Sequence, residues 1–251
     1  MSIKNCYQRL RNLVVFRFRA GQMGVRYSRG RNWQLPKRMR FQQGWLDLTT
    51  PDDLGSKNAF LDIFLGDVYG LRKNRIRLNT IIDIGAHVGF FSLFARMLYP
   101  KAIIHAYEPN PSLWPHLSTH ANYAEIKAVA SAVGLTNGHV SLDFPGDSVF
   151  TQTRNDEAGM VKLTSIHDVV EHIGGRVDLL KLDCEGAEWE ILQDEETLKR
   201  VGMIVMEYHL LDKHTISELL GLFGKNGFEI RFLAEDHPMC GRVWAARRKI
   251  V

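Results

Sequence analysis

Cysteine is scarce in this chain of 251 residues. The three cysteines, Cys6, Cys184 and Cys240, are an odd number spread over the whole length. Such a set fits a reduced protein better than a disulfide framework, which small secreted domains use. We therefore predict free thiols and a cytoplasmic location.

Long apolar runs are also missing. The longest, residues 13–16 and 60–65, fall far short of the roughly 20 residues that a membrane-spanning helix needs. The overall composition, 45% hydrophobic and 24% charged, is that of a globular protein and excludes collagen-like, low-complexity and wholly disordered chains. We expect no transmembrane segment.

Acidic residues are absent from the first 46 positions. This stretch holds eleven Lys and Arg, whereas the remainder has 21 basic and 28 acidic residues. The basic side chains include Arg17, Arg19, Arg26, Arg29, Arg31, Lys37, Arg38 and Arg40. They could form a phosphate-binding or anionic-lipid surface, with peripheral membrane contact, or a solvated lead-in, which we favour. An Arg-rich start also fits a transit peptide, but Trp33, Phe41 and Trp45 are interpreted as core residues.

From Asn79 onward, apolar strand-like runs alternate with helix-period segments at the spacing of βαβ units. This order predicts an α/β, doubly wound, Rossmann-like sheet that is mostly parallel. Strands are predicted at 80–84, 102–107, 126–130, 177–182 and 201–208, and helices at 88–98, 111–122, 165–173, 188–193 and 215–225. Residues 134–160 predict a hairpin-like insertion around a strand at 140–144. We divide the chain into a basic lead-in or cap, residues 1–78, and a main domain, residues 79–251.

The end of the chain is informative because two predicted strands, 228–233 and 242–247, follow each other without a helix between them. Consecutive strands of this kind form an antiparallel hairpin. A seven-stranded sheet that is parallel except for such a hairpin is typical of S-adenosylmethionine-dependent methyltransferases.

A glycine-containing segment, DIGAHVGFFS at residues 83–92, lies where the first predicted strand turns into a helix. Gly85 suits a tight turn, and Gly89 suits a close approach of helix and strand. His87 stands where a dinucleotide fingerprint has its middle glycine, and Asp83 would repel a diphosphate but attract an ammonium or sulfonium group. The loop therefore favours S-adenosylmethionine over a dinucleotide. The alternative for Asp83 is a helix N-terminal carboxylate.

A second acid follows the next predicted strand. Glu108 lies nineteen residues beyond Gly89, before Pro109 and Pro111. This is close to the roughly 20 residues expected for an acid that binds ribose hydroxyls. Glu108 and the glycine loop therefore predict the same nucleoside site.

Further acids follow the predicted strand 177–182. Asp183 is a candidate contact for the methionine portion or the substrate, because the carboxyl ends of parallel strands open into one crevice. For Glu188 we favour a first-turn helix acid. Cys184 stands between two acids, which should raise the pKa of its thiol and makes it a poor nucleophile.

The last motif, Glu207-Tyr208-His209, ends the predicted strand 201–208. Strand alternation places Glu207 and His209 on one face, as an acid–base pair or a structural pair. Asp183, Glu207 and His209 could also bind a metal, but no ligand geometry is fixed, and we predict no required metal. His116 and His120, four residues apart, are interpreted as a surface helix face.

Together these motifs resemble the FkbM family of class I methyltransferases. The resemblance covers about residues 79–211 and rests on DIGAHVG at 83–89, YEPN at 107–110, AVG at 132–134, LKLDCEGAE at 180–188 and EYH at 207–209, with a lead-in at 60–69. His87 departs from the Asn that the family usually carries.

The resemblance implies methyl transfer from S-adenosylmethionine to a hydroxyl of a sugar, polyketide or other small molecule. It implies a cofactor site formed by Tyr69, Asp83, Gly85, His87, Gly89, Phe90, Glu108, Pro109, Ser131 and Asp183. Glu108 would bind the ribose, Ser131 would lie near the adenine and Tyr69 would cap the site. Asp183, Glu185 and His209 would face the methyl-transfer centre, with His209 as the preferred general base and Asp183 as the alternative.

Two other functions remain open at this point. One is a catalytically inactive module that binds the cofactor and a partner. The other is a nucleic-acid-directed methyltransferase that uses the basic N-terminus with its interleaved aromatic residues. The oligomeric state is left open.

Overall fold

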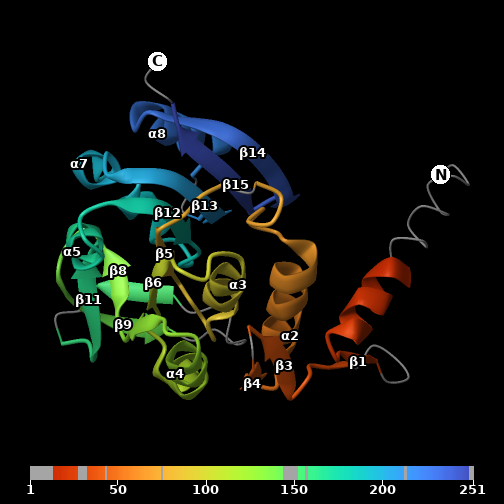
Figure 1. Cartoon of the computed structure of the whole chain (residues 1–251). Helices are drawn as coiled ribbons and strands as arrows, with labels where there is room; N and C mark the ends of the chain where they lie inside the picture. The colour runs from red at the N-terminus through yellow and green to blue at the C-terminus, as the bar shows by residue number, and fades with distance from the viewer. Residues whose placement is uncertain are drawn as a thin grey trace, which may run out of the picture.

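The structure, a computed structural model, describes residues 14–27, 33–42, 44–74, 76–143, 152–155, 158–211 and 214–248. Its centre is a seven-stranded sheet in the order β14-β15-β13-β12-β5-β6-β7 (Figure 1). The strands are β5 (Thr80–Ile84), β6 (Ile103–Tyr107), β7 (Lys127–Val129), β12 (Val177–Leu182), β13 (Val201–His209), β14 (Phe228–His237) and β15 (Cys240–Arg247). β15 is antiparallel to both of its neighbours, while the pairs from β13 to β7 are parallel. The predicted fold class and terminal hairpin are confirmed.

Helices cover both faces of this sheet, as the doubly wound prediction requires. They are α3 (Phe90–Leu98), the 3-10 turn η2 (Pro111–Leu113), α4 (Trp114–Tyr123), α5 (Ile166–His172), α6 (Glu188–Ile191), α7 (Glu195–Leu198) and α8 (Ile216–Lys225). Successive strand residues enter different cores: Ile81 and Leu179 join the cluster that contains α3, whereas Ile82 and Leu180 join the cluster that contains α5 and α8. This alternation explains why these strands read as continuous apolar runs.

The insertion forms a second sheet rather than a single hairpin. Its order is β10-β9-β11-β8, with β8 (Ala132–Gly134), β9 (Gly138–Asp143), β10 (Gln152–Asn155) and β11 (Val161–Ser165). β9 and β10 form the predicted antiparallel pair, and β8 and β11 tie it to the domain as a parallel pair. Phe144, Arg29, Arg31 and Cys6, named above, lie outside the described residues.

The N-terminal segment contains more structure than a lead-in implies. A helix over residues 14–22 precedes β1 (Arg26–Tyr27), β2 (Trp33–Gln34), β3 (Arg38–Phe41), β4 (Gly44–Asp47) and α2 (Leu54–Leu61), which continues into the π-helical turn η1 (Asp62–Gly66). Ala20, Met39 and Phe60 belong to the same core cluster as α3. The Phe60 ring lies 5.5 Å from the ring of Phe90 on α3. The division after residue 78 stays a prediction, but one core joins its two sides.

Two expectations about individual residues are wrong. Trp45 is 56% exposed, because in the β3–β4 hairpin it pairs with Arg40 on the outer face, while Phe41 and Leu46 point into the core. His120 is fully buried instead of lying on a helix surface. Its Nε2 accepts the N–H of Thr49, and its Nδ1 lies 2.7 Å from the carbonyl of Val88, so it links the N-terminal segment to the glycine loop.

No helix among the described residues has the length and apolar character needed to cross a bilayer. The two cysteines that the structure describes, Cys184 and Cys240, are free thiols.

Candidate active site

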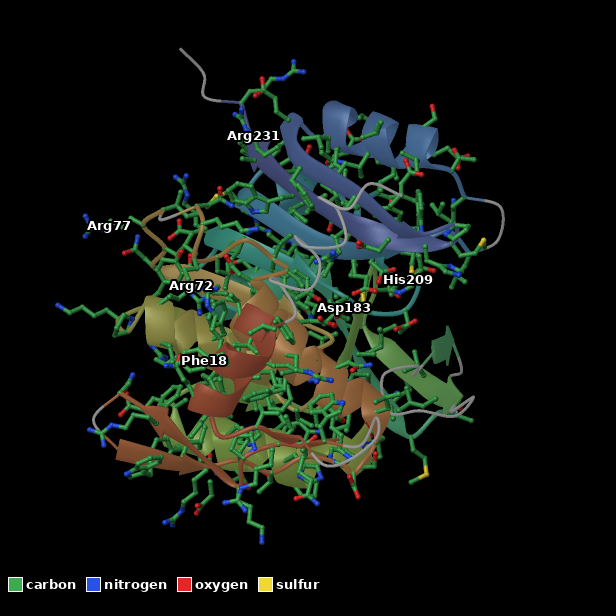
Figure 2. The ribbon with its side chains drawn as sticks, turned by 90° about the vertical axis from the view of Figure 1, so that its right-hand side faces the viewer. Phe18, Arg72, Arg77, Asp183, His209 and Arg231 are labelled. Atoms are coloured by element: carbon green, nitrogen blue, oxygen red, sulfur yellow. The ribbon has the colours of Figure 1, made fainter. Side chains whose placement is uncertain are left out.

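A cavity of about 660 Å³ opens at the carboxyl ends of the central strands. The loop after β5 contributes Gly85, the end of β6 contributes Glu108, and the ends of β12 and β13 contribute Asp183 and His209. Figure 2 shows Asp183 and His209 close to each other beside the sheet. The cavity wall is completed by α2 and by the hairpin of β14 and β15. Parallel strands thus bring four separate sequence motifs to one place, as predicted.

The glycine loop has a backbone conformation in which a side chain at Gly85 would clash. Gly85 has a φ of +73°, and a Cβ on it would lie 1.7 Å from the carbonyl oxygen of Asp183. The N–H groups of Gly85 and Ala86 both donate to the carbonyl of Tyr107 at 3.0 Å. Gly89 (φ +88°) is outside the cavity lining; a Cβ there would lie 2.9 Å from Leu117, so it allows helix packing.

His87 and Phe90 line the cavity on either side of Gly89. His87 has a φ of +53°, in the left-handed region. α3 begins at Phe90 rather than at the predicted residue 88 because Gly89, its N-cap, is also left-handed, with a φ of +88°. Burial lowers the pKa of His87 to about 4, so its imidazole is neutral at physiological pH.

Glu108 clamps the glycine loop from the end of β6. Its Oε2 accepts the N–H of His87 at 2.8 Å, and its Oε1 accepts the N–H of Asn110 at 2.9 Å. Burial raises the pKa of Glu108 to about 7 against the effect of these donors. The carboxyl group lines the cavity beside Pro109, so it is placed both to shape the loop and to contact a ligand.

Asp83 lies behind the cavity lining, not on it. It is fully buried, accepts the hydroxyl of Ser92 at 2.7 Å, and has its other oxygen 3.1 Å from Nζ of Lys181. Lys181 does line the cavity and donates to the carbonyl of Gly85 at 2.6 Å. In this structure Asp83 therefore contacts Lys181 instead of lining the cavity, and its predicted contact with a cationic ligand stays a prediction.

Lys181 was missed as a functional residue in the sequence. The signal was a lone basic residue in the apolar run Leu179-Leu180-Lys181-Leu182 just before an acid. Its side chain is 3% exposed and its Nζ also lies 3.4 Å from Asp183. Burial disfavours the ammonium form, but Asp83 and Asp183 outweigh this and raise the pKa of Lys181 above its usual value.

Asp183 faces the cavity in a defined orientation. Its Oδ2 accepts the hydroxyl of Tyr69 at 2.9 Å. Tyr69 packs edge-on against Phe91 with ring centroids 5.2 Å apart, and burial raises the pKa of its hydroxyl well above the usual value. Tyr69 lines the cavity from the segment before β5, where the cap was expected.

His209 lies between two carboxylates. Its Nε2 is 3.6 Å from Glu185, and its Nδ1 is 3.5 Å from Glu188. Burial opposes its charge, but contact with Glu188 and the charge of Glu185 raise the pKa of His209 to about 9. Burial raises the pKa values of Glu185 and Glu207 to about 7. His209 is thus an imidazolium at neutral pH in this structure.

Glu188 has a larger role than a first-turn helix acid. It does lie in the first turn of α6, but it is fully buried and accepts the N–H groups of Cys184 and Gly186, both at 2.7 Å. Glu207 lines the cavity on the same face as His209, as predicted, while Glu185 and Glu188 approach the imidazole within ion-pair distance. For Cys184, burial and Glu188 raise the pKa of the thiol well above its usual value, as predicted.

One group of side chains has the spacing of metal ligands. The donor atoms of Asp183, Glu185 and His209 all lie within 4.8 Å of one another. Two of these groups already have a cationic neighbour, because Lys181 lies 3.4 Å from Asp183 and the His209 imidazolium lies 3.6 Å from Glu185. That no metal is required stays a prediction.

Comparison with known proteins decides the family. The model of the "Methyltransferase FkbM domain" matches residues 83–230, more than half of the chain. The chain belongs to the FkbM methyltransferase family. The predicted family and enzyme class, a methyltransferase, are thereby confirmed.

Several named relatives are similar to this FkbM-family chain. Methyltransferase sdnD of Sordaria araneosa is 29% identical over 51% of this chain and 65% of its own length. The 31-O-demethyl-FK506 methyltransferase FkbM of Streptomyces tacrolimicus is 24% identical over 64% of this chain and 76% of its own. Hexuronic acid methyltransferase AglP of Haloferax volcanii is 26% identical over 57% of this chain and 61% of its own. The chain thus spans about two thirds of the length of these relatives.

Solved structures are more distant. Magnesium protoporphyrin IX methyltransferase of Synechocystis, determined with bound S-adenosylmethionine, has a TM-score of 0.47 at 12% identity, covering 80% of this chain and 86% of that one.

The cavity of this FkbM-family chain suits a cationic nucleoside ligand. At one end, Glu108 adjoins Tyr107, Ser131 and Val133, an apolar surface suited to a base and a ribose. Ser131 is fully buried there, and its hydroxyl lies 2.7 Å from that of Thr164. At the other end, Asp183, Glu185 and Glu207 favour a positive charge. A phosphate group finds no comparable complement among these acids.

Other lining residues were missed because no local motif marks them. Asn58 and Asp62 reach the cavity from α2 and η1, and Asp236 and Arg242 reach it from the terminal hairpin. Arg242 binds Asp236 through two hydrogen bonds of 2.6 and 2.8 Å. Only the folded arrangement brings these segments to the strand ends.

Proposed function

We propose that this FkbM-family protein transfers a methyl group from S-adenosylmethionine to a hydroxyl group of a small-molecule or glycan acceptor. The observation that carries the proposal is the shared cavity. It combines the glycine loop, a buried Glu108 placed for a ribose, and the acid-rich group of Asp183 and His209.

The residues divide the cavity between donor and acceptor. Glu108 accepts the ribose hydroxyls, and Gly85 leaves room for the adenosyl group over the loop. Asp183, oriented by Tyr69 and Lys181, attracts the ammonium group of the methionine portion. When bound, S-adenosylmethionine supplies a methyl group activated by a positively charged sulfur. The protein must then align the acceptor oxygen and remove its proton.

Polar residues at the far side of the cavity support a hydroxylated acceptor. Asn58, Asp62, Asp236 and Arg242 provide donors and acceptors there. Two relatives carry names that specify 31-O-demethyl-FK506 and a hexuronic acid as the compounds methylated. A hydroxyl of a sugar or of another small molecule therefore fits both the lining and these names.

His209 is the proposed general base. It holds a proton in the ligand-free protein, and Glu185, whose carboxylate lies 3.6 Å from its Nε2, is placed to take that proton. The neutral imidazole can then accept the hydroxyl proton as the acceptor oxygen attacks the methyl carbon. Asp183 is the weaker candidate because its carboxylate already binds Tyr69 and Lys181.

Methyl transfer from radiolabelled S-adenosylmethionine to a panel of sugars, hexuronic acids and macrolides tests this assignment. We expect His209→Gln to lower kcat by about a hundredfold to ten-thousandfold, with unchanged affinity for S-adenosylmethionine. His139→Gln, at an exposed position on β9, is the matched control and should leave kcat unchanged. Full activity of His209→Gln would refute the role of His209 as base.

The other two functions have distinct outcomes in the same assay. Tight binding of S-adenosylmethionine without transfer to any acceptor would indicate an inactive interaction module. The nucleic-acid-directed alternative is not favoured, because none of the described residues before position 54 lines the cavity. The described arginines of the N-terminal segment therefore lie outside the cavity lining.

A further inference from the structure

The helix over residues 14–22 turns apolar side chains toward solvent. Val14, Val15 and Phe18 are 60%, 41% and 66% exposed. Figure 2 shows this helix lying across the front of the molecule, with Phe18 on it. The outer face of a helix on a water-soluble protein is normally polar, so this face needs a separate explanation.

The helical periodicity separates two apolar faces. At about 100° per residue, Phe16 and Ala20 share the inward side. Ala20 is fully buried and Phe16 packs against the core. Val14, Phe18 and Val15 fall within an outward arc of about 100°, which also holds Gln22 at the end of the helix.

Arginines border the outward arc on both sides. Arg17 lies about 60° before Val14 around the helix axis, and Arg19 lies about 40° beyond Val15. Both side chains are exposed. An apolar stripe with a basic residue along each edge is the pattern of a helix that lies in the interfacial region of a membrane.

The inward side is enough to attach the helix to the protein. Beyond Phe16 and Ala20, Met23 also packs against the core, and the N–H of Val25 donates to the carbonyl of Ala20 at 3.0 Å. The outward side chains are therefore not needed to hold the helix in place. They are available to a partner.

The charge of the surrounding sequence selects an anionic partner. Residues 1–46 contain eleven basic and no acidic residues, and Arg26, Lys37 and Arg40 are exposed along with Arg17 and Arg19. A second copy of the chain is disfavoured, because a symmetric contact would bring arginines of like charge together. A nucleic acid would satisfy the arginines, but Phe18 is the one aromatic ring among the three outward apolar side chains, while Val14 and Val15 offer aliphatic surface that suits acyl chains better than bases.

We propose that this helix docks the protein on an anionic lipid surface. Phe18, Val14 and Val15 enter the boundary between headgroups and acyl chains, while Arg17 and Arg19 bind lipid phosphates. The proposal is independent of the methyl-transfer proposal, because the helix contributes no residue to the cavity lining.

Co-sedimentation of the full-length protein with vesicles of phosphatidylcholine, with and without phosphatidylglycerol, tests the docking. We expect binding to the vesicles that contain phosphatidylglycerol, and weaker binding as salt is added. Phe18→Asp should weaken it at least about tenfold, and Arg19→Ser about fivefold. Leu220→Asp, at a 39% exposed position on α8, is the matched control and should bind like the wild type.

Affinity for S-adenosylmethionine, which should be equal in all variants, separates loss of docking from loss of folding. The proposal is overturned if the wild-type protein ignores anionic vesicles, or if Phe18→Asp binds them as tightly as the wild type. It is also overturned if the protein binds RNA but does not bind anionic vesicles. If the wild-type protein forms a dimer that Phe18→Asp dissociates, and does not bind vesicles, the outward face contacts a second copy of the chain instead.

Discussion

Lys181 is the residue on which the electrostatics of the site depend. Its ammonium group is 3% exposed and lies between the carboxylates of Asp83 and Asp183. A buried charge without a partner is costly, so the carboxylate of Asp83 relies on Lys181 for its stability inside the protein.

Replacement of this lysine should therefore destabilise the fold. We expect Lys181→Met to lower the free energy of unfolding by about 3–5 kcal/mol, because it leaves Asp83 uncompensated. Urea denaturation followed by circular dichroism measures the change. The exposed pair of Lys199 and Glu196 supplies the control, since Lys199→Met should have little effect. Equal stabilities of the two variants would contradict this account of Asp83.

Glu108 should make cofactor affinity depend on pH. Burial raises its pKa to about 7 in the free protein, and only the carboxylate form can accept two ribose hydroxyls. Affinity for S-adenosylmethionine should therefore increase as the pH rises through 7, by about tenfold between pH 6 and pH 8. Calorimetric titrations across this range test the sign. Glu108→Gln should flatten the profile, and an affinity that falls with rising pH would contradict it.

The acid-rich group around His209 gives a prediction about metals. Because Asp183 already contacts Lys181 and Glu185 already contacts the His209 imidazolium, we expect transfer activity to survive dialysis against EDTA. Activity that is lost on EDTA treatment and restored by Mg²⁺ or Mn²⁺ would show that Asp183, Glu185 and His209 act as ligands.

At the scale of single residues, sequence reasoning succeeded where a motif and a strand end coincide. Glu108 and Asp183 line the cavity as expected. Asp83 does not line it, because Lys181 lies between Asp83 and the cavity. The position of Asp83 at a strand end does not reveal this arrangement. A pairing between neighbouring strands requires the register that folding supplies.

At the scale of elements, the loop after β5 leaves no room for a side chain at Gly85. We expect Gly85→Ala to abolish S-adenosylmethionine binding and to destabilise the protein, because its Cβ would meet the Asp183 carbonyl at 1.7 Å. Gly138→Ala is the control, since a Cβ there meets no atom within 4 Å. Thermal unfolding and cofactor titration of both variants measure the difference. A folded, cofactor-binding Gly85→Ala protein would contradict the observed loop geometry.

The elements themselves were predictable where periodicity is strong. β12 occupies residues 177–182, the range predicted from its apolar run, and α8 begins one residue after the predicted start because Thr215 is its cap. The helix α2 and the turn η1 were not predicted. Their contribution to the cavity depends on tertiary packing of Phe60 and Phe64 against α3, which no local pattern encodes.

At the scale of the whole molecule, one basic end and one acid-rich cavity coexist. The N-terminal segment exposes Arg17, Arg19 and Arg26 and has no acidic residue before position 47, whereas Asp183, Glu185 and Glu207 gather at the strand ends. The sequence showed this asymmetry in its counts of charges. The arrangement of those charges, with a cationic ligand favoured inside and an anionic surface favoured outside, emerges only from the fold.

The most direct test of the central claim is calorimetric titration of the full-length protein with S-adenosylmethionine and, separately, with NAD. We predict that S-adenosylmethionine alone binds, and that Glu108→Ala weakens this binding by about tenfold to a hundredfold. The control variant Glu196→Ala, at an exposed position, should bind like the wild type. Absence of S-adenosylmethionine binding by the folded wild-type protein, or equal binding of NAD, would contradict the assignment of this cavity.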